Sequence, residues 1–95
     1  MIREPCVYIM SNKPNGTLYV GVTSNLPARV WQHRTGAVPG FTSRYGLTKL
    51  VWYERHEQMA EAISREKQLK AGNRAGKIRL IEESNPHWND LYTTL

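Results

Sequence analysis

Cysteine is nearly absent from this sequence, which contains Cys6 alone among its 95 residues. One thiol cannot form a disulfide within the chain, and one cysteine with three histidines does not supply the ligands of a structural zinc site. Long apolar runs are also missing, since none approaches the roughly 20 residues that a membrane-spanning helix needs. Residues 1–5 contain no apolar stretch typical of a signal peptide. We therefore expect a cytoplasmic protein without a membrane partner.

Acidic residues are fewer than basic ones, and the formal net charge is +5. This excess is compatible with a polyanionic partner. Between residues 65 and 79, Glu66 is the only acid among six basic residues: Arg65, Lys67, Lys70, Arg74, Lys77 and Arg79. An ordinary solvated helix surface explains such a stretch equally well. The chain is too short for two independent cores, so we expect a single domain over residues 1–95.

Two short segments rich in strand formers, residues 6–10 and 18–22, flank a run of turn residues. An antiparallel hairpin is the simplest structure for this pattern. Because successive side chains of a strand point to opposite faces, we expect Tyr8 and Tyr19 on one face, where Gly21 leaves a gap. The other face would be aliphatic and contain Val7, Ile9, Leu18, Val20 and Val22.

Helix signals follow the hairpin. Residues 26–35 have an N-cap candidate in Asn25 and a natural stop in Gly36. Within this helix Arg29 and His33 are one turn apart and therefore neighbours.

The remaining segments complete an α/β fold. Residues 37–46 are expected to form a loop, residues 47–53 a third strand, residues 57–70 a second long helix and residues 75–83 another helical turn or two. The predicted fold is a small three-stranded, mainly antiparallel sheet flanked by helices, in the order β-β-α-β-α-α.

One charged residue of the second long helix falls within an apolar stripe. At about 100° per residue, the stripe consists of Met59, Ala62, Ile63, Glu66 and Leu69. A carboxylate that faces an apolar surface is costly unless it is paired, protonated or bound to a cation. For the helix taken alone, a salt bridge from Glu66 to Lys70 is the favoured interpretation.

Six short motifs follow one another along the chain. They are Cys6-Val7-Tyr8, Tyr19-Val20-Gly21, Arg29-Val30-Trp31-Gln32-His33, Phe41-Thr42-Ser43-Arg44-Tyr45, Arg65-Glu66-Lys67-Gln68-Leu69-Lys70 and Asn85-Pro86-His87-Trp88-Asn89-Asp90-Leu91. Their order over residues 5–92 resembles the GIY-YIG nuclease superfamily, and most closely its small stand-alone bacterial members. A single tripeptide has almost no value, but six ordered matches strongly indicate the fold. One departure is that Cys6 stands where the first name-giving motif has glycine.

The resemblance implies a metal-dependent endonuclease that acts on DNA, for example in DNA repair or recombination. In that family pattern Tyr8 or Tyr19 would activate the attacking water and Arg29 would stabilise the phosphate. His33 would relay a proton or contact the leaving group. Glu66 would bind the metal, Mg²⁺ or Mn²⁺. The basic stretch would bind the nucleic-acid backbone through Lys67, Lys70, Arg74 and Lys77.

The residue types suit phosphodiester hydrolysis on physical grounds. A divalent cation and a guanidinium stabilise the charge that attack by water places on the phosphorane oxygens. A single carboxylate such as Glu66 can hold Mg²⁺ when phosphate and waters complete its shell. A free phenol with a pKa near 10 is a poor base, but a nearby metal and Arg29 would lower the pKa of a tyrosine.

Each of these residues also has a plainer interpretation. The tyrosines could be ordinary strand residues, His33 a packed histidine and Arg29 part of a surface ion pair. The tryptophans are interpreted as core residues rather than base-stacking platforms: Trp31, Trp52 and Trp88.

Two alternatives exist for the whole chain. The main one is a nucleic-acid-binding module that cuts slowly or not at all, and another is a basic structural or protein-interaction domain. Recognition of a substrate would come from its shape, from a partner protein or from a homodimer.

Overall fold

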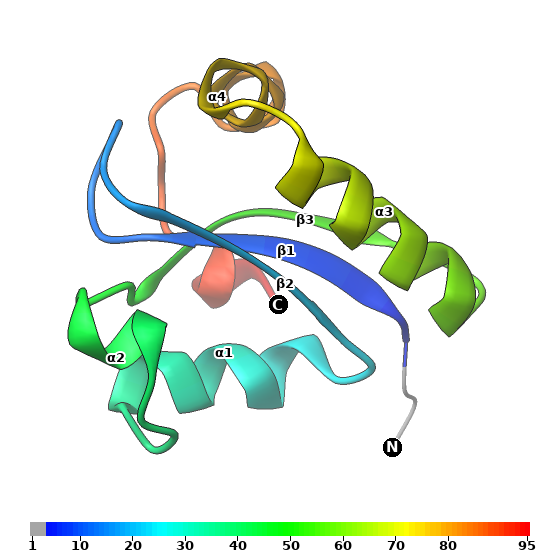
Figure 1. Ribbon diagram of the computed structural model, residues 1–95. Coiled ribbons are helices and arrows are strands. Elements are labelled where there is room, and N and C mark those ends of the chain that lie inside the picture. The colour runs from blue at the N-terminus through cyan, green and yellow to red at the C-terminus, as the bar shows by residue number, and fades with distance from the viewer. Residues whose placement is uncertain (1–3) are drawn as a thin grey trace.

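Three antiparallel strands and their flanking helices make up the computed structural model, which describes residues 4–95 (Figure 1). The elements are β1 (Cys6–Ser11), β2 (Leu18–Thr23), α1 (Leu26–Thr35), α2 (Phe41–Arg44), β3 (Lys49–Arg55), α3 (Met59–Ala71), α4 (Arg74–Ser84) and the 3-10 helix η1 (Leu91–Thr94). The predicted α/β class and element order are confirmed, with the short elements α2 and η1 in addition. Across residues 4–95 no helix has both the length and the apolar character that a membrane crossing requires.

β1 is the central strand of the sheet, and it pairs with β2 on one side and β3 on the other. All six of its residues are buried. Tyr8 is paired with Gly21 of β2 and with Tyr53 of β3. The pairing with β3 shifts between Ile9 and Met10, which marks a β-bulge. The predicted hairpin is therefore confirmed, and its register places Tyr8 directly opposite Gly21.

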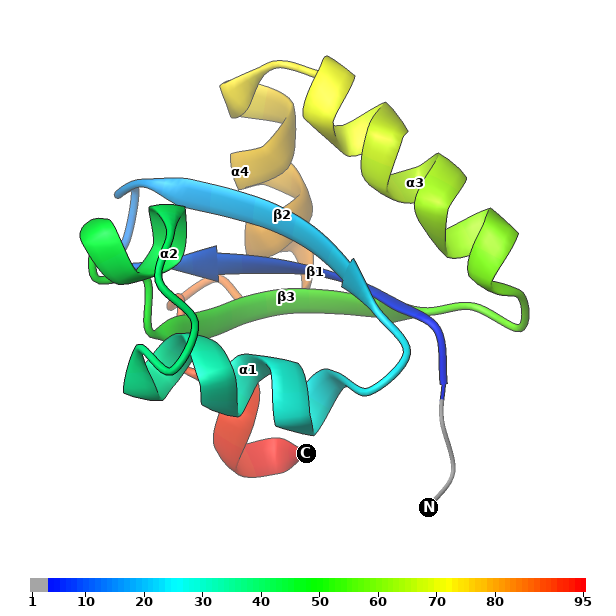
Figure 2. The same ribbon diagram turned by 60° about the horizontal axis from the view of Figure 1, so that its bottom comes forward.

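Helices cover both faces of the sheet (Figures 1 and 2). α3 and α4 lie over one face, and the buried core on that side consists of Val7, Ile9, Val20, Val51, Trp52, Ala62, Leu69, Ile81 and Trp88. α1 and η1 lie over the other face, and the buried core there consists of Cys6, Tyr8, Met10, Leu26, Val30, Leu47 and Leu50, with Tyr19 packed beside them. The predicted separation of an aliphatic face from a tyrosine face is confirmed.

α1 begins and ends where its capping residues indicate. The Asn25 side chain accepts a hydrogen bond from the backbone N–H of Ala28, and Gly36 adopts the left-handed conformation that ends the helix. Its buried face contains Leu26, Val30 and His33. Trp31, one residue beyond Val30, is rotated out of that face and is 53% exposed. The prediction that Trp31 is a core residue is therefore wrong, whereas Trp52 and Trp88 are buried as predicted.

The expected loop over residues 37–46 contains a helical turn, which corrects the sequence prediction. α2 is bracketed by Gly40 and Gly46, both with positive φ, so the chain can turn sharply before and after four helical residues. Thr42 of this turn is buried, and its carbonyl accepts a hydrogen bond from the backbone N–H of Leu47 at 2.8 Å. These contacts fix a segment too short to show helical periodicity.

The boundaries of β3, α3 and α4 differ by a few residues from those predicted from the sequence. β3 spans Lys49–Arg55 rather than residues 47–53, because its first partner is Ser11, the last residue of β1. α3 begins at Met59 with a capping box formed by Gln58 and Glu61. α4 has 11 residues and is longer than the predicted turn or two, since the Asn73 side chain caps it and Asn85 ends it.

The buried side chain of Asn85 fastens the C-terminal segment to the sheet. Its Nδ2 donates to the carbonyl of Val51 at 3.1 Å and to that of Asn89 at 2.9 Å. Its Oδ1 accepts from the backbone N–H of Asn89 at 3.0 Å. This one amide therefore holds the turn after α4 against β3.

We expect Asn85→Ala to lower the free energy of unfolding by about 2–3 kcal/mol, because it leaves the buried carbonyl of Val51 and partly buried backbone groups of Asn89 without their partner. Urea unfolding followed by circular dichroism measures this change. Asn89→Ala is the matched control, since Asn89 takes part through its backbone and its side chain is exposed. Equal stability of the two variants would contradict this role of Asn85.

Candidate active site

Tyr8 and Tyr19 extend from the sheet face that α1 covers, and their ring centroids are 6.3 Å apart. A Cβ at Gly21 would lie 2.5 Å from both Cζ and Oη of Tyr8 and 2.9 Å from Cε1 of Tyr19. Such separations are far inside van der Waals contact, so no side chain fits at Gly21 beside these rings. The predicted gap is therefore confirmed, and Tyr8 fills it.

A chain of three side chains connects β1 to α1 and α2. Tyr8 Oη lies 2.8 Å from His33 Nε2, and His33 Nδ1 lies 2.8 Å from Thr42 Oγ1. All three residues are buried. His33 reaches Tyr8 because it continues the buried face of α1, seven residues after Leu26. The structure thus brings Tyr8 and His33 into direct contact.

His33 is held in its neutral form. Burial and the positive charge of Arg29 lower the pKa of His33 from 6.5 to about 4. A neutral imidazole has one donor nitrogen and one acceptor nitrogen. Either Tyr8 donates to Nε2 while Nδ1–H donates to Thr42, or both bonds run in the opposite direction. In both arrangements His33 donates one hydrogen bond and accepts the other, and so links Tyr8 to Thr42.

Arg29 approaches both tyrosines from α1. Its Nη1 donates to Gln32 Oε1 at 2.9 Å, which fixes one arm of the guanidinium. Burial acts against the charged form, but hydrogen bonds and charge interactions with Tyr8 and Tyr19 outweigh it and raise the pKa of Arg29. Burial likewise raises the pKa of Tyr8 to about 12, although hydrogen bonding with Arg29 acts in the other direction. Arg29 therefore acts to lower the Tyr8 pKa as expected, but burial is the larger effect and the net shift is upward.

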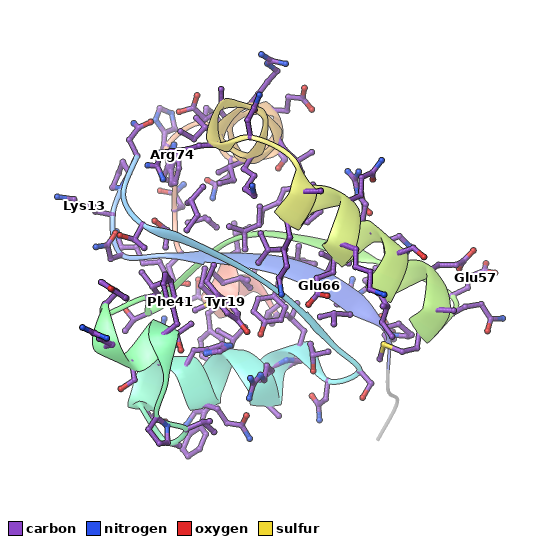
Figure 3. The ribbon with its side chains drawn as sticks, in the orientation of Figure 1. Lys13, Tyr19, Phe41, Glu57, Glu66 and Arg74 are labelled. Atoms are coloured by element: carbon purple, nitrogen blue, oxygen red, sulfur yellow. The ribbon has the colours of Figure 1, made fainter. Side chains whose placement is uncertain are left out.

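Glu66 faces the same region from α3. Its side chain is only 16% exposed, and in Figure 3 it lies on the side of α3 toward the sheet. Its negative charge contributes to raising the pKa of Tyr8. The predicted salt bridge is confirmed, with Lys70 Nζ 3.3 Å from Glu66 Oε2. Ala62 and Leu69 of the predicted apolar stripe are buried, whereas Ile63 is 37% exposed.

The four basic residues predicted to bind nucleic acid lie on α3 and α4, and three of them have protein partners. Lys70 pairs with Glu66, and Lys77 Nζ donates to the carbonyl of Gly72 at 2.9 Å. Arg74 donates to the carbonyls of the hairpin turn, Asn15 and Gly16, each at 2.6 Å (Figure 3). Arg74 thus fastens the hairpin to the start of α4. Lys67 is exposed.

Thr42 and Gln32 also belong to this site, and neither was selected from the sequence. Both lie inside motifs that the sequence does contain, but a hydroxyl or an amide in a motif does not show which side chain it contacts. Thr42 contacts His33 because α2 folds back on α1. The contact depends on the helical turn of α2, which the sequence does not predict.

The fold is that of a GIY-YIG domain, and comparison with known proteins agrees. Residues 4–79 match the family model described as the GIY-YIG catalytic domain. A UPF0213 protein of Staphylococcus haemolyticus is 36% identical over 77 residues, which cover 81% of this chain and 93% of that protein. A UPF0213 protein of Clostridium perfringens is 38% identical over 79 residues, covering 83% of this chain and 84% of that protein. No solved structure matches the chain significantly.

The chain therefore belongs to the GIY-YIG family. The resemblance first seen in its motifs is confirmed, including the small size of its bacterial relatives. The family is one of nuclease domains, whose substrate is nucleic acid.

We expect Gly21→Ala to displace the Tyr8 ring and to lower the free energy of unfolding by about 1–3 kcal/mol. Gly72→Ala is the matched control, because a Cβ there would meet its nearest neighbour at 3.4 Å and the φ of Gly72 is negative. Urea unfolding measures stability, and NMR of the His33 ring reports whether the bond to Tyr8 survives. An unchanged His33 spectrum in a stable Gly21→Ala protein would contradict the steric argument.

The lowered pKa of His33 predicts a loss of stability in acid. Since its pKa is 6.5 in the unfolded chain and about 4 in the folded one, stability is complete above pH 6.5 and falls as the pH drops from 6.5 toward 4. The linked loss is about 3 kcal/mol in total. We expect His33→Gln to flatten this part of the profile, whereas His87→Gln, at an exposed position, keeps the wild-type slope. NMR titration that shows His33 protonating near pH 6.5 would contradict this expectation.

Proposed function

We propose that the protein is a Mg²⁺- or Mn²⁺-dependent endonuclease that hydrolyses DNA phosphodiester bonds. The observation that supports this most is the grouping of Tyr19, Arg29 and His33 around Tyr8, with the Glu66 carboxylate close enough to influence Tyr8. These are the residues that the family motifs select, and they come from β1, β2, α1 and α3.

Arg29 is proposed to bind the phosphate and to stabilise the charge of the transition state. A guanidinium has five N–H donors in a planar fork, and the bond to Gln32 uses one of them. The pKa of Arg29 is raised, so its charge is permanent at any working pH. A phosphate at this point would lie against the Tyr8 and Tyr19 hydroxyls, which already interact with Arg29.

Tyr8 and His33 are proposed to remove the proton from the attacking water together. With a pKa of about 12, Tyr8 is protonated at pH 7 and cannot act as a preformed phenolate. His33 is neutral, and its Nε2 lies 2.8 Å from Tyr8 Oη. Tyr8 can therefore accept the water proton while it passes its own proton to His33. Tyr19 is the alternative base. When Tyr8 is the base, Tyr19 holds the water or the phosphate.

Glu66 is the proposed metal ligand, and the donor set fits a hydrated cation that arrives with the substrate. Within residues 4–95 no group of three or more His, Cys, Asp or Glu residues could hold a metal. Mg²⁺ is commonly bound through one or two carboxylates, with substrate phosphate and waters completing its shell. When bound, it supplies Lewis-acid stabilisation and a positive charge that favours ionisation of Tyr8. Lys70 must then give up its pairing with Glu66.

The alternative is a nucleic-acid-binding module that does not cut. The ion pair between Glu66 and Lys70 and the raised pKa of Tyr8 favour it, because both describe a resting site rather than an active one. It requires the same fold and the same basic surface. Only a cleavage measurement separates the two functions.

We expect cleavage of DNA in a panel of single-stranded, duplex and branched substrates with Mg²⁺ or Mn²⁺. EDTA should abolish it, and Glu66→Gln and Arg29→Ala should each reduce the rate about 100-fold or more. Glu57→Gln is the matched control, because Glu57 is exposed at the far end of the molecule (Figure 3). No cutting of any substrate by folded protein that still binds DNA would establish the binding module instead. Undiminished cutting by Glu66→Gln would exclude the proposed metal ligand.

A further inference from the structure

The aromatic rings of the site continue outward onto the surface of α2. The ring centroids of Tyr19 and Phe41 are 6.1 Å apart with planes inclined by 29°, and those of Phe41 and Tyr45 are 4.7 Å apart. Tyr19 in turn lies 5.5 Å from the His33 ring. Phe41 and Tyr45 are each 46% exposed. A continuous row of rings, here called the aromatic row (Tyr19, Phe41 and Tyr45), therefore leads from the site to solvent.

This exposure is built into the fold. α2 is held from its inner side, where Thr42 bonds to His33 and accepts from the N–H of Leu47, which is fully buried. Because Thr42 points inward, its neighbour Phe41 and the following Tyr45 are turned toward solvent. An exposed apolar surface of this kind generally marks a place of interaction. The fold thus fixes the aromatic row against the site.

Two cations lie against the aromatic row, Arg44 beside Tyr45 and Arg29 beside Tyr19. The chain has no acidic residue between Glu4 and Glu54, and the basic residues of that stretch are Lys13, Arg29, Arg34, Arg44 and Lys49, of which Arg34 is paired with Asp90. The guanidinium of Arg44 lies 5.6 Å from the Tyr45 ring centroid. Lys13 projects from the same end of the molecule as Phe41 (Figure 3). Exposed rings among cations are the surface that unpaired nucleotides require, since bases stack on the rings and phosphates meet the cations.

We propose that Phe41 and Tyr45 stack on unpaired nucleobases next to the phosphate that the site binds, so that the preferred substrate is a single strand or an unpaired segment of DNA. The proposal rests on the proposed function for the position of that phosphate. Inside a duplex each base face is covered by its neighbours, so the rings gain stacking contacts only where bases are unpaired. Tyr19 connects the candidate active site to the exposed rings of α2, because it contacts both His33 and Phe41.

The test is a binding measurement on the full chain in EDTA, where no metal-dependent cleavage occurs. The probes are a fluorescein-labelled oligothymidine, a duplex of the same length and a strand in which the central nucleotides are abasic. Phe41→Leu and Tyr45→Leu keep apolar volume but remove the aromatic face. Trp31→Leu is the control, since Trp31 is also an exposed aromatic residue but lies on α1, outside the aromatic row.

We expect each aromatic-row variant to bind oligothymidine about 5- to 100-fold more weakly than the wild type. Binding of the duplex should be the same for the variants and the wild type. The wild type should bind the abasic strand as weakly as the variants bind oligothymidine. Trp31→Leu should bind every probe as the wild type does. Equal losses on all three probes, or no loss on oligothymidine, would overturn the proposal. Sedimentation showing that Phe41→Leu abolishes a dimer without changing DNA affinity would assign the patch to self-association and also overturn it.

Cleavage separates this proposal from the nuclease proposal. A wild-type protein that cuts nothing with Mg²⁺ or Mn²⁺, yet loses oligothymidine affinity in Phe41→Leu, refutes the nuclease and supports base stacking. A wild-type protein that cuts duplex and single strands equally, at rates that Phe41→Leu and Tyr45→Leu do not change, supports the nuclease and refutes base stacking.

Discussion

The buried contact between Tyr8 and His33 is the interaction on which the rest of the site depends. It joins the central strand to α1, and the second ring nitrogen of His33 joins α1 to α2 through Thr42. A phenol, an imidazole and a hydroxyl would each be costly to bury alone, so their mutual pairing lets a polar chain cross the core. Within residues 4–95 no buried side-chain nitrogen or oxygen lacks a partner. The placement of α2, and with it the exposed rings of the aromatic row, follows from this polar chain.

The surroundings of the site affect the charges of its residues in different directions. Burial makes Tyr8 and His33 harder to charge, while the two tyrosines stabilise the charged form of Arg29. The negative charge of Glu66 reaches Tyr8 and makes its ionisation harder. A cation beside Glu66 would reverse that influence. The same carboxylate therefore opposes a reactive tyrosine in the free protein and would favour one once a metal is bound.

Much of the fold could be predicted because its signals are local. Alternation placed Tyr8 and Val7 on opposite faces, and Asn25 and Gly36 marked the ends of α1. α2 was missed because four helical residues show no periodicity. Trp31 is exposed, although tryptophan is usually a core residue, because its angle on α1 places it outside the face formed by Leu26, Val30 and His33. For the site, the motifs selected residues that the structure brings together. Three features depend on tertiary packing and could not be predicted: the contact of His33 with Thr42, the partners of Arg74, and the larger effect of burial than of Arg29 on the Tyr8 pKa.

The two glycine positions of the family's name differ in whether this chain has room for a side chain there. Cys6 occupies the first, where a side chain is accommodated in the core at 1% exposure. Gly21 occupies the second, and the volume that any side chain would need there already belongs to the Tyr8 ring. Gly21 and Tyr8 are therefore coupled positions, because any side chain at Gly21 needs volume that the Tyr8 ring fills. The side chain at the first position leaves Tyr8 in place, whereas a side chain at the second would require a smaller residue at position 8.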